Sequence, residues 1–366
     1  IRNNFNKTTM QQAMSKPHNF SAGPSILAQS AFDNAISAIK DFEGTGLSIL
    51  EVSHRGKEFV KIMDDAQQIV KDLLNVPDGY EVLYLQGGAS TQFLMVAMNL
   101  LEKKAGYINT GTWANKAIKE AKYHGEINVL GSSEDKGFSY IPKGYTIPSD
   151  LDYFHCTSNN TIAGTQMHEF PDCGQVPLVC DMSSDIFSRP IDVSKFSLIY
   201  AGAQKNMGPA GVTLVIIKKD ILGKVTSHIP TMLDYNTHIS KGSMFNTPPV
   251  FPIYVSLQNM KWVKEMGGVT AMEKRNNEKA DLIYGEIDSN PLFKGTTAVE
   301  DRSKMNVTFL LEDESLTEKF LAAATAAKIS GIKGHRSVGG FRASIYNVLP
   351  LESVQALVNV MKTFNN

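Results

Sequence analysis

The sequence predicts an α/β protein: a large domain with a mostly parallel mixed sheet flanked by helices, then a smaller α+β C-terminal domain. Over the first half of the chain, apolar runs typical of buried strands alternate with amphipathic runs typical of helices. That alternation is the pattern of a parallel sheet with helical crossovers. Around residues 235–252 it stops in a polar, proline-rich stretch, after which two long helix-like runs and a different order of elements follow.

The predicted strands of the large domain are short apolar runs bounded by turns. EVLYL at 81–85 is the first of them. A helix is expected at 90–101, because apolar residues recur there near helical spacing, and another at 113–125, ended by Gly125. The other expected strands cover 105–109, 151–158, 176–183, 196–203 and 211–219.

The second half predicts the smaller domain. Helix-like runs at 253–268 and 269–288 are followed by a strand at 305–311, a helix at 314–328, a strand at 341–347 and a helix at 351–364. A chain of 366 residues suggests two domains. We expect a large domain over 14–265, whose segment 14–30 is a candidate to pack on the small domain, and a small domain over 266–366. Residues 1–13 are interpreted as a polar tail or an expression remnant.

Composition excludes several classes of protein. With 36 Lys and Arg against 37 Asp and Glu, the net charge of −1 gives no basic footprint for nucleic acid. No apolar run reaches the roughly eighteen residues of a membrane helix, and the first residues contain no apolar core of a secretory signal. Cys156, Cys173 and Cys180 are too few and too irregularly spaced for a disulfide framework or a zinc site, so we expect no metal and a reducing compartment, the cytosol.

A glycine-rich turn, Gln86 to Thr91, lies between the first predicted strand and its helix. Small residues at a helix N-terminus expose backbone N–H groups, which suits a phosphate or another anion. The turn is neither GxGxxG nor a P-loop. A tight turn with a Ser or Thr cap is an equally good interpretation of these residues alone.

Two charged residues follow neighbouring predicted strands. Asp181 ends PLVCD, where a side chain points toward the usual ligand crevice of an α/β sheet, although a cap or turn role is an alternative. Lys205 in AGAQKN lies among small and apolar residues, so it is either a desolvated amine nucleophile or a buried structural lysine. A phosphate cradle, an Asp for the pyridinium nitrogen and a Lys for a Schiff base are the three anchors of pyridoxal phosphate. Trp113 is a candidate to stack on its ring, or an ordinary core residue.

Basic pairs complete the candidate site. His54 and Arg55 are adjacent in SHRG, and His335 and Arg336 lie six residues before Arg342 in GHRSVGGFR. Arg binds carboxylate or phosphate through two parallel hydrogen bonds. Together these pairs suit a substrate with a phosphate and a carboxylate, whereas each alone is typical of an ordinary surface.

These residues occur in a set of ordered motifs that closely resembles the phosphoserine aminotransferase family, homodimeric enzymes of the fold-type I, class-V pyridoxal-phosphate group. The resemblance runs from about Lys16 to the C-terminus. Its motifs are HNFSAGPSIL (18–27), SHRG (53–56), QGGAS-QF (86–93), GTWA-KA (111–117), NNTI-GTQ (159–166), D-SSD (181–185), AGAQKN-GPAG (201–211), NTPP (246–249) and GHRSVGGFRAS-YN (334–347).

The resemblance implies a role for each matching residue. Lys205 matches the Schiff-base lysine, Asp181 the partner of the pyridine nitrogen, and Trp113 the aromatic side chain stacked on the ring. The other positions that match cofactor contacts are Thr161 for the phenolic oxygen, Ala89, Ser90 and Gln204 for the phosphate, and Asn246 and Thr247 for the phosphate of the other subunit. Arg342 matches the arginine that holds the substrate carboxylate. The binders of the substrate phosphate are matched by His335 and Arg336, with His54 and Arg55 from the partner subunit.

The resemblance also implies the reaction, a ping-pong transamination that converts L-glutamate and 3-phosphohydroxypyruvate to 2-oxoglutarate and O-phospho-L-serine in serine biosynthesis. Some relatives also act on 4-phosphohydroxy-L-threonine in pyridoxine synthesis, and the sequence leaves that activity open. The main alternative is another aminotransferase of this fold, such as an alanine–glyoxylate aminotransferase, which has no phosphate to bind. A cysteine desulfurase would need a reactive Cys late in the chain. A non-catalytic relative would lack the lysine, and a Rossmann oxidoreductase would need the GxGxxG motif.

Overall fold

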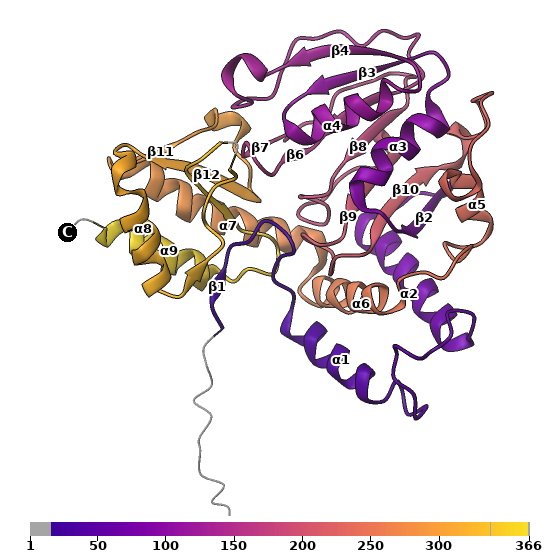
Figure 1. The fold of residues 1–366 in the computed structure, drawn as a ribbon, viewed down its shortest axis with the longest axis horizontal. Helices are drawn as coiled ribbons and strands as arrows, with labels where there is room; N and C mark the ends of the chain where they lie inside the picture. The colour runs from indigo at the N-terminus through magenta and orange to yellow at the C-terminus, as the bar shows by residue number, and fades with distance from the viewer. Residues whose placement is uncertain (1–15, 337, 365–366) are drawn as a thin grey trace, which may run out of the picture.

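The computed structural model describes residues 16–336 and 338–364 (Figure 1). The predicted tail at 1–13 lies outside these residues. The chain forms a large seven-stranded sheet covered by helices and, beside it, a smaller unit built on a three-stranded sheet. The predicted α/β class with a mostly parallel mixed sheet is confirmed.

The seven-stranded sheet has the order β2-β10-β9-β8-β5-β3-β4. Only β10 runs antiparallel to its two neighbours, and every other pair is parallel. The carboxyl ends of the parallel strands therefore meet at one edge, where α/β sheets bind ligands. The strands are β2 (Tyr80–Leu85), β3 (Lys104–Asn109), β4 (Glu126–Ser132), β5 (Phe154–Thr157), β8 (Leu178–Asp181), β9 (Leu198–Gly202) and β10 (Thr213–Lys218).

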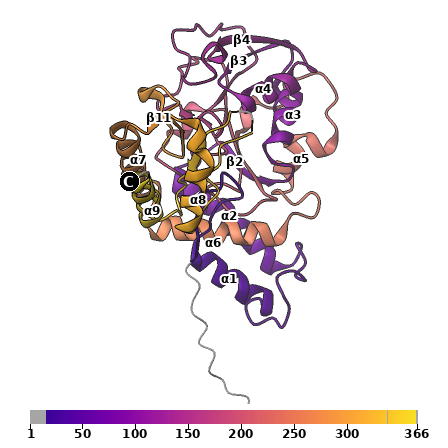
Figure 2. The ribbon, with the colours of Figure 1, turned by 60° about the vertical axis from the view of Figure 1, so that its left-hand side comes forward.

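Helices bury both faces of this sheet (Figure 2). Alternate strand residues point to opposite faces, so Cys180 and Ile199 pack in one core while Val179 and Tyr200 pack in the other. The first core is closed by α2 (Lys57–Leu74) and α6 (Val250–Glu265), and the second by α3 (Gly88–Leu100) and α4 (Thr112–Ala121). Burial on both faces explains why these strands are almost continuously apolar in sequence.

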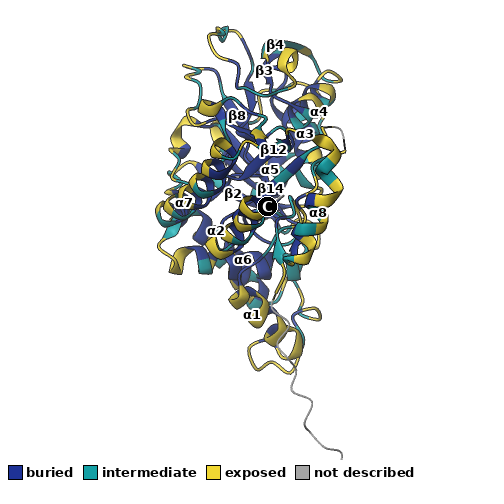
Figure 3. Cartoon of the chain, turned by 90° about the vertical axis from the view of Figure 1, so that its left-hand side faces the viewer, coloured by how far each residue is buried: buried dark blue, intermediate teal, exposed yellow. Residues whose placement is uncertain are grey.

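The smaller unit has its own core. Its antiparallel sheet has the order β11 (Phe293–Gly295), β12 (Asn306–Leu311) and β14 (Phe341–Ser344). Stacked and edge-on phenylalanine rings, among them Phe309, Phe320 and Phe341, fill the space between this sheet and the helices. Those helices are α7 (Gly268–Ser289), α8 (Thr317–Ala326) and α9 (Leu351–Thr363). Figure 3 shows this unit from its outer side, with the exposed helix faces in yellow.

The N-terminal segment joins the smaller unit before it reaches the large sheet. Strand β1 (His18–Asn19) pairs in parallel with β13 (Ile329–Ser330), and Phe20 is completely buried in the core of the smaller unit. The chain then continues to α1 (Gln29–Lys40), which protrudes below α6 (Figure 1). The division into domains at 14–265 and 266–366 stays a prediction.

Most predicted elements are present with shorter ends, but some lie outside the predicted set. Strand β4 is missing from it because this edge strand is only partly buried along its length, so its sequence has no continuous apolar run. Helix α2 is also missing, although its buried residues recur at helical spacing. A short helix, α5 (Tyr235–Ser240), interrupts the stretch at 235–252. No helix in the described part of the chain is long and apolar enough to cross a membrane.

Candidate active site

The candidate site lies where the carboxyl ends of β8 and β9 meet segments that follow β2 and β5. Asp181 is the last residue of β8, and Lys205 follows β9 by three residues. Thr161 comes directly after the short strand β6 (Asn159–Asn160), which pairs with β7 (Thr165–Gln166). The fold thus brings together three predicted site residues from three separate stretches of sequence.

Lys205 is the centre of this group. Its Nζ donates a hydrogen bond to Thr161 Oγ1 at 2.9 Å and lies 5.7 Å from the ring centroid of Trp113. Burial lowers the pKa of Lys205 to about 8, although the negative charges of Asp181 and Asp185 act in the opposite direction. About a tenth of the amine is therefore neutral at pH 7, which makes Lys205 a usable nucleophile.

Asp181 is buried, and its charge acts on Lys205. Its Oδ1 accepts hydrogen bonds from Ser183 N at 2.9 Å and from Ser183 Oγ at 2.6 Å. Ser183 Oγ in turn accepts a hydrogen bond from Gly202 N, which ties the group to the end of β9. Burial raises the pKa of Asp181, and the Ser183 hydrogen bonds and the charge of Lys205 oppose that rise. A cationic N–H placed against this carboxylate would relieve its desolvation.

The glycine-rich turn forms an open helix N-terminus. Gly87 and Gly88 have φ angles of 92° and 68°, and a Cβ on Gly87 would lie 2.0 Å from Thr91 Oγ1. Helix α3 begins at Gly88, and no side chain in the described ranges caps it. The predicted anion site at Ala89 and Ser90 therefore has the required backbone geometry.

Gln86 and Gln204 border this turn and the lysine loop. Gln86 Nε2 donates to the carbonyl oxygen of Thr247 at 3.1 Å, so the exposed pair Asn246 and Thr247 lies beside the start of the turn. The carbonyl oxygen of Gln204 accepts a hydrogen bond from Ser25 N at 2.9 Å, and that of Lys205 accepts one from Ser25 Oγ. The N-terminal segment therefore supports the lysine loop, a role that no sequence signal indicated.

Arg342 reaches the site from the smaller unit. Its Nη1 donates to the carbonyl oxygen of Thr161 at 3.3 Å, while its buried Nε has no hydrogen-bond partner among the described residues. Burial also lowers the pKa of Arg342. Thr161 thus contacts Lys205 through its side chain and Arg342 through its backbone. A guanidinium with a buried, unpaired N–H is suited to bind a carboxylate.

A cluster of positive charge adjoins this arginine. His335 is half-buried, and burial together with the charges of Arg342, Arg336 and Lys116 lowers its pKa. Lys116 Nζ lies 4.5 Å from the ring centroid of Trp113, on the same helix, α4. Lys116 is absent from the predicted site. Its position three residues after Trp113 puts both side chains on one helix face, so the helical spacing could have indicated Lys116 as a site residue.

Asp185 is a second buried carboxylate that the predictions omit. It accepts hydrogen bonds from Ser158 Oγ and from Gln166 Nε2, and Arg189 Nη2 lies 3.9 Å away. Burial raises its pKa, and the charge of Arg189 opposes that rise. The sequence signal that could have indicated Asp185 is its position four residues after Asp181.

His54 and Arg55 are not brought to this group. They lie between α1 and α2, at the lower end of the molecule in Figure 1, and Arg55 is exposed. No contact in the described part of the chain links either residue with Lys205 or Arg342.

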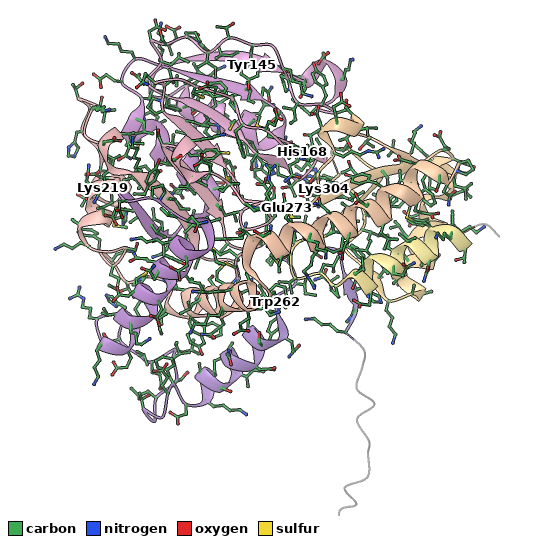
Figure 4. All side chains as sticks on the ribbon, turned by 180° about the vertical axis from the view of Figure 1, so that it is seen from behind. Tyr145, His168, Lys219, Trp262, Glu273 and Lys304 are labelled. Carbon is green, nitrogen blue, oxygen red and sulfur yellow. The ribbon has the colours of Figure 1, made fainter. Side chains whose placement is uncertain are left out.

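A cavity of about 610 Å³, which is lined by Tyr145 and His168 among others (Figure 4), contains none of the predicted site residues. Nowhere among the described residues do three His, Cys, Asp or Glu gather as metal ligands.

Comparison with known proteins shows the family. The sequence model of the class-V aminotransferases matches residues 18–357. A phosphoserine aminotransferase of Parabacteroides distasonis is 62% identical over 95% of this chain and 99% of its own length. This chain belongs to the phosphoserine aminotransferase family.

Solved structures agree with this membership. A phosphoserine aminotransferase from Bacillus circulans subsp. alkalophilus superposes with a TM-score of 0.93 at 46% identity, covering 95% of this chain and 98% of its own. One from Trichomonas vaginalis, described as bound to pyridoxal phosphate (PLP), has a TM-score of 0.89 at 38% identity, covering 95% and 100%. The family and the fold-type I architecture implied by the resemblance are confirmed.

Proposed function

We propose that this chain is a phosphoserine transaminase that uses pyridoxal phosphate to move an amino group between L-glutamate and 3-phosphohydroxypyruvate. The products are 2-oxoglutarate and O-phospho-L-serine, so the enzyme acts in serine biosynthesis. The observation that carries the proposal is the chain of contacts from Lys205 through Thr161 to Arg342, which puts an amine nucleophile beside a carboxylate anchor. An alanine–glyoxylate activity is not favoured, because the close relative at 62% identity is a phosphoserine aminotransferase.

The residues present fit the cofactor by the chemistry of their side chains. Pyridoxal phosphate supplies an aldehyde for covalent attachment and a ring that accepts the electron pair released at the substrate Cα. Lys205 would offer the amine, and the buried carboxylate of Asp181 would hold the proton on the ring nitrogen. The open N–H groups of Ala89 and Ser90, with Gln204, receive the phosphate, and Asn246 and Thr247 serve the site of the other subunit.

Lys205 has a second task in this proposal. Its neutral Nζ would accept the proton from the substrate Cα when the amine is not attached to the cofactor. The hydrogen bond to Thr161 Oγ1 and the ring of Trp113 restrict where the amine lies while it does so. Thr161 would also hold the phenolic oxygen of the cofactor, and Trp113 would contact its ring.

Arg342 and the cationic cluster bind the substrate. Arg342 orients the carboxylate that all the substrates share. Arg336 and Lys116 supply positive charge, and His335 an N–H donor, for the phosphate of phosphoserine and, in the other half-reaction, for the γ-carboxylate of glutamate. Because of this cluster, we expect each substrate to carry a second anionic group besides the carboxylate at Arg342.

A second copy of the chain completes the site in this proposal. Helix α1 exposes Phe32, Ile36 and Ile39 at helical spacing, and Ile36 is 52% exposed (Figure 3). The adjoining loop carries His54 and Arg55, which have no contact with the site of their own chain. We infer a homodimer in which α1 packs on the partner and this loop supplies both residues to the partner's substrate phosphate.

The compartment is proposed to be the cytoplasm. Cys156 and Cys180 lie on paired strands with their Sγ atoms 3.6 Å apart, and both are free thiols. Two thiols this close stay reduced most readily in the cytosol.

The proposed function is tested by steady-state kinetics of the loaded enzyme with L-glutamate as donor. We expect kcat/KM for 3-phosphohydroxypyruvate to exceed that for pyruvate or glyoxylate by at least about a hundred-fold, because only the first places a dianion in the cationic cluster. Similar values for all three acceptors, or a preference for glyoxylate, would overturn the assignment and favour a different aminotransferase.

A further inference from the structure

Lys279 is a lysine that neither the sequence motifs nor the mechanism uses. It lies in the middle of α7, six residues after Glu273, which Figure 4 labels near the start of this helix. Its side chain is 1% exposed, and no described carboxylate forms an ion pair with it. Burial, together with the charge of Arg275, holds its pKa well below the usual range.

A buried lysine side chain without a counter-charge is costly. An apolar side chain of similar length would avoid the desolvation, so the amine has to provide something that methylene groups do not. Its two partners are backbone carbonyl oxygens. Lys279 Nζ donates to Ile345 O at 2.7 Å and to Tyr346 O at 2.6 Å.

These two carbonyls belong to the segment that leaves β14, which we call the exit segment (residues 345–347). Arg342 lies in β14 three residues before the segment begins. Beyond the strand the carbonyl oxygen of Ile345 has no backbone donor among the described residues, so the Lys279 amine supplies the donor that a buried carbonyl requires. The carbonyl oxygen of Tyr346 accepts from Leu349 N at 3.0 Å and gains a second donor from Lys279. Asn276, one turn before Lys279 on the same helix face, holds the third residue through its hydrogen bond to Asn347 Oδ1 at 2.8 Å.

The exit segment also contacts the lysine loop of the large sheet. Asn347 N donates to Asn206 Oδ1 at 3.0 Å, and Asn206 directly follows Lys205. Tyr346 Oη donates to the carbonyl oxygen of Ala22 in the N-terminal segment and accepts from Asn306 Nδ2. One short stretch therefore connects the strand of Arg342 with the loop of Lys205.

We propose that Lys279 is a positioning residue that holds the exit segment and thereby fixes the placement of Arg342 relative to Lys205. This rests on the proposed roles of those two residues in binding the substrate carboxylate and the cofactor. Lys279 touches neither substrate nor cofactor in this assignment. It acts through two hydrogen bonds to the backbone, and a loosened exit segment would let the carboxylate anchor move away from the reacting amine.

The test compares Lys279→Met, which keeps an unbranched side chain one atom shorter and removes the donors, with Lys274→Met, a change at an exposed lysine on the same helix. Kinetics are normalised to sites that carry covalently bound cofactor, counted from the visible absorption band. We expect Lys279→Met to lose about a hundred-fold in kcat/KM, with KM raised for both glutamate and phosphoserine, because an anchor displaced by about 1 Å has that effect. Lys274→Met should stay within about two-fold of the wild type.

Two further measurements separate positioning from general stability. Hydrogen exchange of the protein without cofactor should show faster exchange for amides of residues 344–349 in Lys279→Met but not in Lys274→Met. In an Arg342→Lys background, Lys279→Met should change KM by less than about three-fold, because both changes affect the same anchor. Lower melting temperature with unchanged KM and kcat per loaded site would overturn the proposal, since Lys279 would then be structural only.

Lys279→Gln decides the case if Lys279→Met does not fold. It keeps one N–H donor group and removes the charge, so we expect an intermediate rise in KM and intermediate exchange at residues 344–349. Wild-type kinetics together with wild-type exchange in Lys279→Gln would overturn the proposal. Absence of transamination by the wild-type enzyme would defeat the proposed function instead, while the exchange measurement would still report whether Lys279 holds the exit segment.

Discussion

At the scale of single residues, Thr161 is the point where the two halves of the site meet. The strand ends predict that Asp181 and Lys205 share an edge, because each follows a strongly apolar run and parallel strands end on the same side. The link from Thr161 to Arg342 spans 181 residues and depends on how the smaller unit packs. No local pattern contains that information: the basic residues near 335–342 indicated a candidate anion site, and only the resemblance to a family gave Arg342 the substrate carboxylate.

Lys205→Ala should abolish transamination, with a loss of at least about 10⁴-fold, because no other described amine contacts Thr161 Oγ1. The cofactor should then be held only non-covalently. Reduction with borohydride followed by mass spectrometry should attach the cofactor to the wild type and not to the variant. Turnover within ten-fold of the wild type would remove Lys205 from its role.

The pH dependence of cofactor capture follows from the pKa of Lys205. The amine reacts only when neutral, so the rate at which cofactor-free protein binds pyridoxal phosphate covalently should rise with pH and reach half its plateau near pH 8. Asp181 favours the charged lysine, so Asp181→Asn should lower that pKa and move the midpoint to lower pH. Stopped-flow absorbance measures both midpoints. A wild-type midpoint near 10.5, or a midpoint that rises in Asp181→Asn, would contradict this electrostatic account.

At the scale of elements, turns and loops carry most of the residues that we propose to bind cofactor and substrate. The glycines of the turn after β2 predict a tight turn at a helix start, which leaves an anion site and an ordinary capped turn equally open, and the positive φ angles of Gly87 and Gly88 at the start of α3 appear only in the structure. The sequence of the loop that carries His335 and Arg336 does not show that it belongs to a cationic cluster. The other charges of that cluster, Lys116 on α4 and Arg342 on β14, lie on separate elements. Charge at a site adds up over elements that are far apart in sequence.

Arg336→Ala should raise KM for 3-phosphohydroxypyruvate by about ten- to a hundred-fold and KM for glutamate by less than about three-fold. The reason is that a dianionic phosphate gains more from this guanidinium than a carboxylate does. Lys333→Ala is the matched control, because Lys333 is exposed and faces Glu318 instead. Equal increases for both substrates would assign Arg336 a general or structural role.

At the scale of the whole molecule, segments from both ends of the chain build one site. Ser25 supports the lysine loop, β1 pairs with β13 of the smaller unit, and β14 carries Arg342. Alternating strand and helix patterns could predict the large sheet, because each element has its own periodicity. They could not predict that the N-terminal segment pairs with β13 of the smaller unit, since two-residue strands such as β1 have no periodic signal.

A shared dimer site predicts complementation between inactive variants. Lys205→Ala and Arg55→Ala should each be inactive alone, and subunit exchange should restore about a quarter of the wild-type sites, because half of the dimers are mixed and each has one intact site. Activity is measured after exchange is verified with two differently tagged chains. Verified exchange without recovery would mean that Arg55 serves its own subunit.

In the proposed function, Lys205, Arg342 and the cationic cluster form one site for a phosphorylated amino acid. The most direct measurement is the visible absorption spectrum of the purified, cofactor-loaded protein during titration with O-phospho-L-serine, with L-alanine as control. We predict a yellow band that phosphoserine converts to the colourless amine form of the cofactor at concentrations where alanine has no effect. Conversion by alanine, or a protein that forms no band with added pyridoxal phosphate, would contradict the account.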